Sequence, residues 1–327
     1  MGQEVRVAII GVGKMGILHL EKFRAVEGVK LVGFFDPDDQ RAEWVTRIQG
    51  VPRFDSLAAL LFVSDAAVVS APTPLHFLLA KQVLDARVHL LLEKPGCEGL
   101  DSLQMLVQQA RERSLIFQVG FVERFRLRAL AEGIPMEGIR FIESHRLTPS
   151  LGRDASADVV RDILVHDVDL VLSLVGEEPS HVAAVGVSVI TGTWDLANVR
   201  LEFSSGTVAN LTASRVSKSV LRKFRVFAGR NYSSFDLAAN TVETTSVRGQ
   251  ELLSGRREFE LDPLALQARD FVSAVRGERP LQVDAAGVLG VWRCLNRITD
   301  AMRLQASLPA ARGFDPGLDR ASQRWPT

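Results

Sequence analysis

The sequence predicts an α/β domain built on a doubly wound parallel sheet, followed by an α+β domain whose sheet is open and mostly antiparallel. Two observations support the first part. Short apolar runs alternate with helical patterns up to about residue 120, and a glycine-rich turn follows the first run. The third observation is a change beyond that point, where strand candidates follow one another across short turns. Strand–helix alternation is typical of parallel sheets, whereas closely spaced strands favour antiparallel neighbours.

The first domain, residues 1–120, is expected to hold five parallel strands with helices on both faces of the sheet. Each strand candidate is a short apolar run, and the stretches between them repeat apolar residues at helical spacing. The predicted strands are residues 5–10, 30–35, 66–71, 88–92 and 115–119, and the predicted helices are residues 15–26, 74–86 and 100–113. Open α/β sheets bind ligands at the carboxyl ends of their strands, so the site is expected there.

The second domain, residues 121–327, is expected to bind substrate and to mediate oligomerisation. The predicted strands are residues 138–147, 181–190, 197–203, 207–216, 223–228 and 233–238, and two helices, 263–276 and 285–306, follow them. Alternating strands such as 198–203 and 208–212 leave one sheet face to be covered. An exposed apolar face usually marks an interface, so we expect a homodimer or homotetramer.

The charge balance argues against nucleic acid and membrane as partners. Lys+Arg and Asp+Glu both number 39, so the net charge is zero and the chain has no general attraction for polyanions. No signal-peptide pattern precedes the first strand and no apolar run is long enough to span a bilayer, so we expect a cytoplasmic protein. Cys97 and Cys294 are too few and too far apart to indicate a disulfide framework or a zinc site.

A G-x-G-x-x-G motif, residues 11–16, lies between the first strand and the first helix, as in a Rossmann domain. Gly11 allows the tight turn, Gly13 lets the backbone approach a pyrophosphate, and Gly16 allows close packing of helix and strand. Asp36 ends the second strand, where its carboxylate would accept hydrogen bonds from a ribose and repel a 2′-phosphate. The motif therefore predicts NAD as cofactor, while Arg41 leaves NADP open. The residues expected at the cofactor are Gly11, Gly13, Lys14, Met15, Gly16, Asp36, Ala71, Pro72, Thr73, His76, Glu93 and Lys94.

Lys94 is the first candidate catalytic residue. It lies in Glu93-Lys94-Pro95, directly after the strand 88–92 and therefore at the carboxyl edge of the sheet. The chain contains only seven lysines, so Lys94 is less readily explained as a surface residue without a specific role. A lysine can hydrogen-bond a substrate hydroxyl and its pKa responds to burial, whereas an arginine stays charged. The alternative is an ordinary loop lysine.

A helix around residues 158–175 carries the second group of candidates. At 100° per residue its polar side chains fall within an arc of about 80°, and the remainder is almost entirely apolar. The polar residues are Asp158, Asp162, His166, Asp169 and Ser173. Asp162 and His166 are neighbours one turn apart, so the carboxylate can orient the imidazole as a general base. A buried pair that only stabilises the helix, or a metal site, are the alternatives.

With these elements in this order, the chain resembles the Gfo/Idh/MocA oxidoreductase family over nearly its whole length. The resemblance implies a dehydrogenase with an open, mostly antiparallel second sheet that is often used for oligomer contacts. It also implies roles for Lys94, Asp162 and His166 in oxidising a hydroxyl on a sugar-like ring.

Three segments, residues 119–125, 162–169 and 208–215, resemble the UDP-N-acetylglucosamine 3-dehydrogenase branch, which includes enzymes that supply amino sugars for lipid A. This resemblance implies that the 3-hydroxyl of a UDP-N-acetylhexosamine is the reacting group. The weaker candidates for holding such a nucleotide sugar are Glu123, Arg124, Arg146, Asp169 and Arg215. The alternatives are a dehydrogenase of another sugar or cyclitol, and a non-catalytic NAD-sensing regulatory protein of the same fold.

Overall fold

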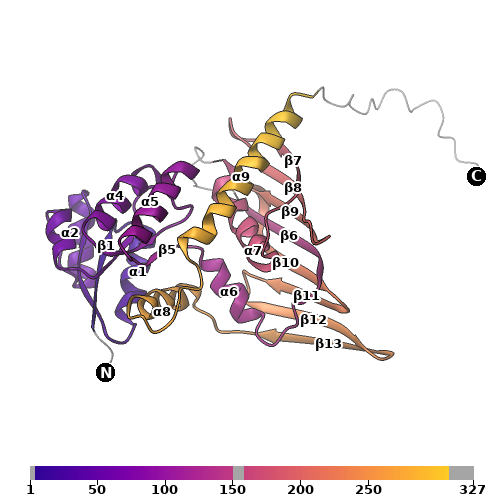
Figure 1. Cartoon of the computed structure of the whole chain (residues 1–327), viewed down its shortest axis with the longest axis horizontal. Helices are drawn as coiled ribbons and strands as arrows, with labels where there is room; N and C mark the ends of the chain where they lie inside the picture. Colours follow the sequence, from indigo (N-terminus) through magenta and orange to yellow (C-terminus); the bar gives the residue numbers. More distant parts are fainter. Residues whose placement is uncertain (1–3, 150–157, 309–327) are drawn as a thin grey trace, which may run out of the picture.

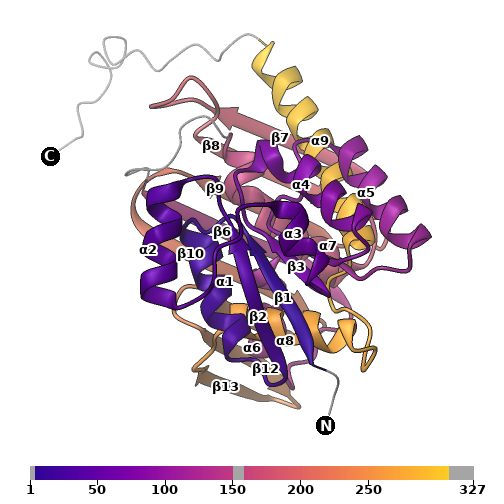
Figure 2. The ribbon, with the colours of Figure 1, turned by 90° about the vertical axis from the view of Figure 1, so that its left-hand side faces the viewer.

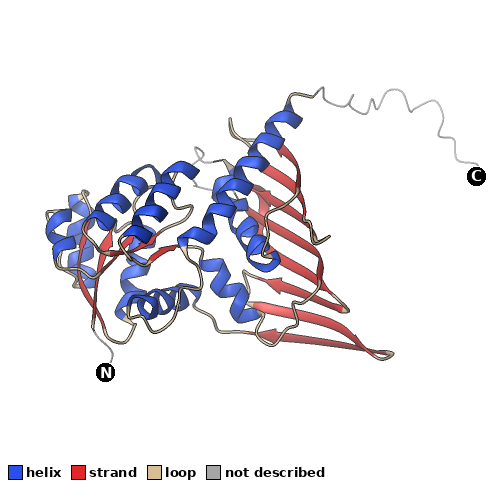
Figure 3. Ribbon diagram, in the orientation of Figure 1, coloured by secondary structure: helices blue, strands red, loops and turns tan. Residues whose placement is uncertain are grey.

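The computed structural model describes residues 4–149 and 158–308. Two β-sheets lie side by side, and most of the helices that belong to the larger sheet lie between them (Figure 1). Figure 3 shows the contrast between the small helix-covered sheet and the large sheet that is bare on one side. This arrangement confirms the predicted fold class.

The first sheet has five strands, all parallel, in the order β2-β1-β3-β4-β5. The strands are β1 (Val5–Ile10), β2 (Val29–Phe35), β3 (Ala66–Val69), β4 (His89–Leu92) and β5 (Phe117–Val119). Each lies within the predicted run or differs from it by one or two residues at an end. β1, β3, β4 and β5 are mostly buried, which is why they appear in the sequence as apolar runs. In β2, at the edge of the sheet, only Gly33 and Phe34 are buried.

Helices cover both faces of this sheet (Figure 2). The helices of this part of the chain are α1 (Lys14–Arg24), α2 (Asp39–Gln49), α3 (Leu57–Phe62), α4 (Thr73–Asp85) and α5 (Leu100–Glu112). Ala8 and Ile10 pack with α3, α4 and α5, whereas Val7 and Ile9 pack with α1 and α2 on the opposite face. The alternation of β1 side chains therefore divides the core into two layers.

One helix crosses the domain boundary expected from the sequence. Helix α8 (Pro263–Val275) belongs by sequence to the second domain, yet Ala268, Phe271 and Val272 join the core formed by α1, α2 and β1. Phe23 of α1 meets Phe271 edge-on, with ring centroids 6.2 Å apart. The C-terminal part of the chain therefore completes the helical layer of the first sheet.

The second sheet has eight strands in the order β13-β12-β11-β10-β6-β9-β8-β7. All neighbours are antiparallel except β6 and β9, which are parallel, so the prediction of a mostly antiparallel sheet is confirmed. The strands are β6 (Ile139–Pro149), β7 (His181–Val187), β8 (Leu196–Glu202), β9 (Val208–Ser214), β10 (Val216–Ala228), β11 (Asn231–Asp236), β12 (Thr241–Arg248) and β13 (Glu251–Glu258).

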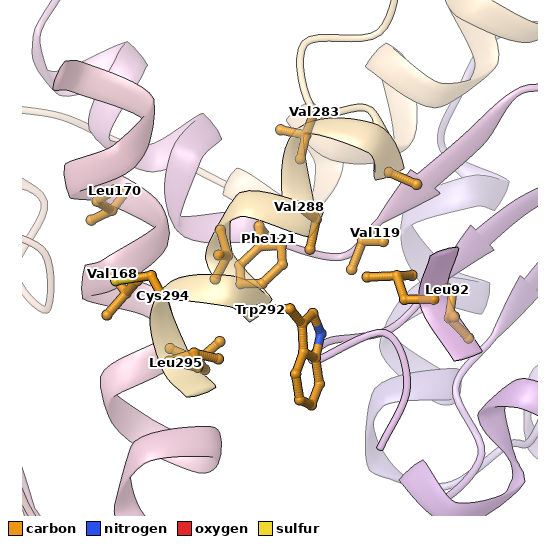
Figure 4. Close-up of a cluster of buried hydrophobic side chains, with 14 of the residues drawn as sticks. Leu92, Val119, Phe121, Val168, Leu170, Val283, Val288, Trp292, Cys294 and Leu295 are labelled. Carbon is orange, nitrogen blue, oxygen red and sulfur yellow. The ribbon is translucent and has the colours of Figure 1, made fainter. Parts of the chain in front are cut away.

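The helices of this sheet lie on one face only (Figure 1). They are α6 (Val122–Leu130), a π-helical turn η1 (Val160–Leu164) that continues into α7 (Val165–Val175), and α9 (Ala285–Ala306). Figure 4 shows Trp292, Cys294 and Leu295 of α9 among buried side chains of the other elements, including Val168 of α7. The opposite face keeps exposed apolar residues, among them Val185, Val187 and Phe227.

Candidate active site

The glycine motif builds a turn that leaves room for a phosphate group. Gly11 has φ +85°, and a Cβ on it would lie 2.8 Å from the Ala71 nitrogen. A Cβ on Gly16 would lie 2.0 Å from the Gly11 oxygen, so α1 packs too closely on the turn for any side chain. At Gly13, the N-cap of α1, a Cβ would have no neighbour within 4 Å. Because the first turn of α1 also carries no acidic residue, its N–H groups fit a pyrophosphate.

Asp36 is fixed at the end of β2 by the backbone around it. Its carboxylate accepts hydrogen bonds from the backbone N–H groups of Val12, at 2.8 Å, and Asp38, at 2.9 Å. Arg41 lies on the solvent side, 3.6 Å from Asp36 and 3.1 Å from Asp38. The carboxylate thus stands beside the glycine turn with its orientation set, as ribose recognition requires.

His76 and Glu93, both predicted at the cofactor, are buried beneath the loops. The ring nitrogens of His76 lie 2.9 Å from the Gly96 oxygen and 2.7 Å from the Ala71 oxygen, and burial lowers the pKa of this imidazole. Glu93 contacts the ring of His19 at 2.8 Å and accepts a hydrogen bond from the Lys94 backbone N–H. These two side chains therefore hold together the loops after β3 and β4.

Lys94 and Asp162 meet across the junction of the two sheets. The Lys94 ammonium donates to the side-chain and backbone oxygens of Asp162, each at 3.2 Å. Both side chains are partly exposed and both line a cavity of about 480 Å³. Pro72, Thr73 and Pro74 form another wall of that cavity, so the predicted cofactor loop and the predicted catalytic lysine share one space.

Asp162 belongs to the π-helical turn, in which the backbone N–H of Val165 donates a hydrogen bond to the backbone oxygen of Val160. π-turns are rare and frequently occur at functional sites. The wider turn changes the angular position of the residues before α7, so the polar stripe expected at 100° per residue does not face a single cleft. Asp162 reaches the cavity, whereas Asp169 points elsewhere and is fully buried.

His166 follows one turn after Asp162, on α7. Its side chain is half-buried and meets the ring of Phe121 edge-on, with centroids 6.5 Å apart. Phe121 is fully buried at the N-cap of α6, so it provides a rigid wall for the imidazole. His166 thus lies on α7, directly after the turn that carries Asp162, but it is not among the residues that line the cavity with Lys94 and Asp162.

Two of the three arginines predicted to hold substrate, Arg124 and Arg146, form ion pairs with buried carboxylates. Arg124 binds both oxygens of Asp169, at 2.9 and 2.8 Å, and burial raises the pKa of Asp169 to about 6. Arg146 binds Asp167 in the same way, at 3.0 and 3.1 Å. Burial alone would lower the pKa of Arg146, but the carboxylates of Asp167 and Glu123 together outweigh burial and raise that pKa.

Glu123 and Arg215 are likewise buried. Glu123 lies 3.6 Å from the Arg146 guanidinium, at the centre of the same charged cluster. None of the five weaker candidates (Glu123, Arg124, Arg146, Asp169 and Arg215) is among the residues that line the cavity with Lys94. Glu123, Arg124, Arg146 and Asp169 belong to ion pairs that connect α6, α7 and β6.

Two residues that the sequence did not single out line the cavity beside Lys94. Trp292 of α9 donates from its indole nitrogen to the Pro95 oxygen at 2.9 Å. The Arg161 guanidinium lies over the ring of Trp292, 5.4 Å from its centroid. These contacts connect segments far apart in the chain, which is why no local pattern indicated them.

Within the described residues, no group of three or more His, Cys, Asp and Glu side chains is arranged to hold a metal ion. The same residues contain no helix that is long and apolar enough to cross a membrane. Cys97 and Cys294 are both buried free thiols, and burial raises the pKa of each to about 12. Their thiols therefore stay protonated at neutral pH.

Comparison with known proteins agrees with this geometry. Residues 5–121 match the Gfo/Idh/MocA oxidoreductase family, NAD-binding Rossmann fold, and residues 139–230 match a C-terminal domain of that family. UDP-N-acetylglucosamine 3-dehydrogenase of Acidithiobacillus ferrooxidans is 36% identical over 299 residues, which cover 88% of this chain and 93% of that protein. The scyllo-inositol 2-dehydrogenase (NAD(+)) of Bacillus subtilis is 28% identical over 66% of this chain and 69% of that protein.

Solved structures give the same result. A structure of the A. ferrooxidans UDP-N-acetylglucosamine 3-dehydrogenase superimposes with a TM-score of 0.87 at 33% identity, covering 92% of this chain and 98% of that one. The scyllo-inositol dehydrogenase of Lactobacillus casei, solved with bound NAD(H) and scyllo-inositol, superimposes with a TM-score of 0.77 at 17% identity, covering 93% and 98% of the two chains. The second similarity is one of fold.

Proposed function

The chain belongs to the Gfo/Idh/MocA family of oxidoreductases, and on this premise we propose that it oxidises the 3-hydroxyl of a UDP-N-acetylhexosamine with NAD as cofactor. The observation that carries the proposal is the meeting of Lys94 with Asp162 on the wall of one cavity. An ammonium group at the carboxyl edge of a dinucleotide-binding sheet suits the hydroxyl of an alcohol substrate. The 36% identity to the A. ferrooxidans enzyme favours UDP-N-acetylglucosamine as the first substrate to test.

The glycine turn, Asp36 and the loop at Pro72–Pro74 would hold the cofactor, with the pyrophosphate at the N-terminus of α1 and the adenosine ribose at Asp36. NAD, when bound there, supplies an acceptor for the hydride that leaves the substrate carbon. The division into a cofactor domain (residues 1–120) and a substrate domain (residues 121–327) is part of this proposal.

Lys94, Asp162 and His166 would act on the proton of the substrate hydroxyl. Oxidation removes a hydride from carbon and a proton from oxygen, so the carbon–oxygen bond becomes a carbonyl. We assign the proton to the imidazole of His166, which suits a general base near neutral pH. Lys94 would donate a hydrogen bond to the substrate oxygen and stabilise negative charge on it, while Asp162 fixes the direction of the ammonium.

The sheet face without helices supports a further part of the proposal, a homodimer or homotetramer. Phe227 is 39% exposed and packs against Phe141 and Tyr232, with ring centroids 5.7 and 4.9 Å away. Burying an aromatic row of this kind against a second copy removes apolar surface from water. A cytoplasmic location, as expected from the sequence, is also part of this proposal.

The experiment tests a panel of substrates and measures NADH formation with each. UDP-N-acetylglucosamine and UDP-N-acetylgalactosamine are compared with inositols and free sugars, each with NAD. Turnover only of UDP-sugars is the expected result. Turnover only of a cyclitol would favour the second candidate, which the 28% identity to the B. subtilis inositol enzyme supports. NAD binding without turnover of any substrate would favour an NAD-sensing protein.

A further inference from the structure

Arg161 is an exposed arginine on the wall of the cavity that contains Lys94 and Asp162. It directly precedes Asp162 in the π-helical turn. Arg124 and Arg146 are neutralised by Asp169 and Asp167, but within residues 4–149 and 158–308 Arg161 has no carboxylate within ion-pair distance. Its charge is therefore available to an anionic ligand in this cavity.

The ring of Trp292 fixes the position of this guanidinium. Trp292 is 1% exposed, so its ring has little freedom, and the Arg161 guanidinium carbon lies 5.4 Å from the ring centroid. A guanidinium that stacks on an aromatic face keeps the N–H groups at its edge free to donate. The edge of Arg161 is thus suited to bidentate binding of a phosphate group.

Two hydrogen bonds connect the neighbourhood of Arg161 with that of Lys94. Trp292, beneath the guanidinium, donates to the oxygen of Pro95, the residue after Lys94. Asp162, the residue after Arg161, binds the Lys94 ammonium. Because both cations line the same cavity of about 480 Å³, a single ligand of nucleotide-sugar size can contact both.

The cavity is also lined by acidic residues, which would repel an anionic ligand. Asp158 and Glu98 also line it, and Asp158 uses one carboxylate oxygen to cap the turn, accepting from the backbone N–H groups of Val160 and Arg161. A diphosphate entering here meets like charge, so its binding depends on a compensating guanidinium.

We propose that Arg161, stacked on Trp292, is the residue that binds the diphosphate of the substrate while the sugar ring lies at Lys94. The inference rests on the proposed function and deepens it, because it assigns the preference for nucleotide sugars over neutral sugars or cyclitols to one side chain. A neutral polyol gains nothing from this guanidinium, whereas a diphosphate gains charge-assisted hydrogen bonds.

The experiment compares Arg161→Ala and Arg161→Lys with a matched control, Arg269→Ala. Arg269 is an exposed arginine of α8 that, within the described ranges, also has no carboxylate partner, and it lines a separate cavity of about 960 Å³. Isothermal titration with UDP and with NAD gives dissociation constants without turnover, and initial rates give kcat and KM for UDP-N-acetylglucosamine.

For Arg161→Ala we expect the Kd of UDP and the KM of the UDP-sugar to rise roughly 10- to 100-fold, the usual scale for a hydrogen bond to a charged group. The Kd of NAD and kcat should change little. Arg161→Lys should recover part of the loss, because the charge remains without the bidentate edge. Arg269→Ala should match the wild type.

Unchanged UDP binding in Arg161→Ala would overturn the inference. A loss of NAD affinity instead of UDP affinity in that variant would also overturn it. So would an equal loss of UDP affinity in the control, Arg269→Ala. The proposed function fails separately. A wild type that binds UDP through Arg161 but oxidises no UDP-sugar would retain the anion site and lose the reaction. An Arg161→Ala variant that oxidises the UDP-sugar as well as the wild type does would leave the proposed reaction standing and refute the diphosphate site.

Discussion

The Lys94 ammonium lies 3.2 Å from a carboxylate oxygen of Asp162, and this contact joins the edge of the parallel sheet to the helical layer of the second sheet. The two residues are 68 positions apart in the chain. Because both side chains are about one quarter exposed, the ion pair adds little to stability. Its consequence is positional, since it fixes the Lys94 ammonium at the wall of the cavity.

Replacing Lys94 tests its proposed role, which is to hydrogen-bond the substrate oxygen and stabilise negative charge on it. Lys94→Met should reduce kcat by roughly 10²- to 10⁴-fold, the scale for removing a group that acts on the reacting proton or charge. The Kd of NAD should stay within a few-fold, because the glycine turn and Asp36 are separate from this contact. Asp162→Asn keeps the size of the side chain but weakens the hold on the ammonium, so its loss of kcat should be smaller. A Lys94→Met enzyme with normal kcat would refute the assignment.

Asp36 should set the preference for NAD over NADP. Its carboxylate is oriented by two backbone N–H groups and would oppose a 2′-phosphate. Asp36→Asn should therefore narrow the ratio of the two dissociation constants by roughly 10-fold or more. Titration of both cofactors into wild type and variant measures this. Equal or tighter binding of NADP by the wild type would contradict the expectation.

The bare face of the large sheet should carry the oligomer interface. Phe227→Asp places a charge in the aromatic row with Phe141 and Tyr232, so light scattering should show a smaller species than the wild type. Phe62→Asp is the control, because Phe62 is 88% exposed on α3 of the first domain and its change should leave the assembly intact. A monomeric wild type at micromolar concentration would count against the interface.

Asp195 should make stability depend on pH. It is fully buried, and burial alone would raise its pKa, but hydrogen bonds from Thr191 and from the backbone of Val189 and Ile190 outweigh burial and hold the pKa well below its ordinary value. A depressed folded pKa stabilises the protein above the unfolded value, about 3.9, and this stabilisation is lost as pH falls toward the folded value.

The variant Asp195→Asn should therefore lower the free energy of unfolding by about 1–3 kcal/mol at neutral pH, and the difference from wild type should shrink below about pH 4. Chemical denaturation at both pH values measures it. Asp300→Asn is the control, since Asp300 pairs with Arg303 on the exposed surface of α9 and contributes little. A difference that does not vary with pH would show that the charge of Asp195 is not the cause.

The fold was predictable wherever burial leaves a pattern in the sequence. Buried parallel strands such as β3 and β4 are continuous apolar runs, and the helices α8 and α9 repeat apolar residues at helical spacing. The elements that were missed are α2, α3, α6, β12 and β13. Strand β13 is exposed along its whole length, and α3 has only six residues, although Ser56 caps it in the usual way.

The contact of Lys94 with Asp162 in the candidate site was predictable because each residue carries a local signal. Lys94 follows a strand directly, and Asp162 lies on an apolar helix, so each was identified from its own segment. The contact of Arg161 with Trp292 was not predictable, because Trp292 reaches the Lys94 loop from 197 residues away. The carboxylates that neutralise Arg124 and Arg146 are likewise set by tertiary packing, which single segments do not encode.

A crystal structure with NAD and UDP-N-acetylglucosamine tests the central claim most directly. The account predicts that the sugar 3-hydroxyl lies within hydrogen-bond distance, about 2.6–3.2 Å, of both Lys94 and His166, with the diphosphate on Arg161. A closed complex in which His166 lies more than about 8 Å from that hydroxyl would contradict it, because no direct proton transfer spans such a distance.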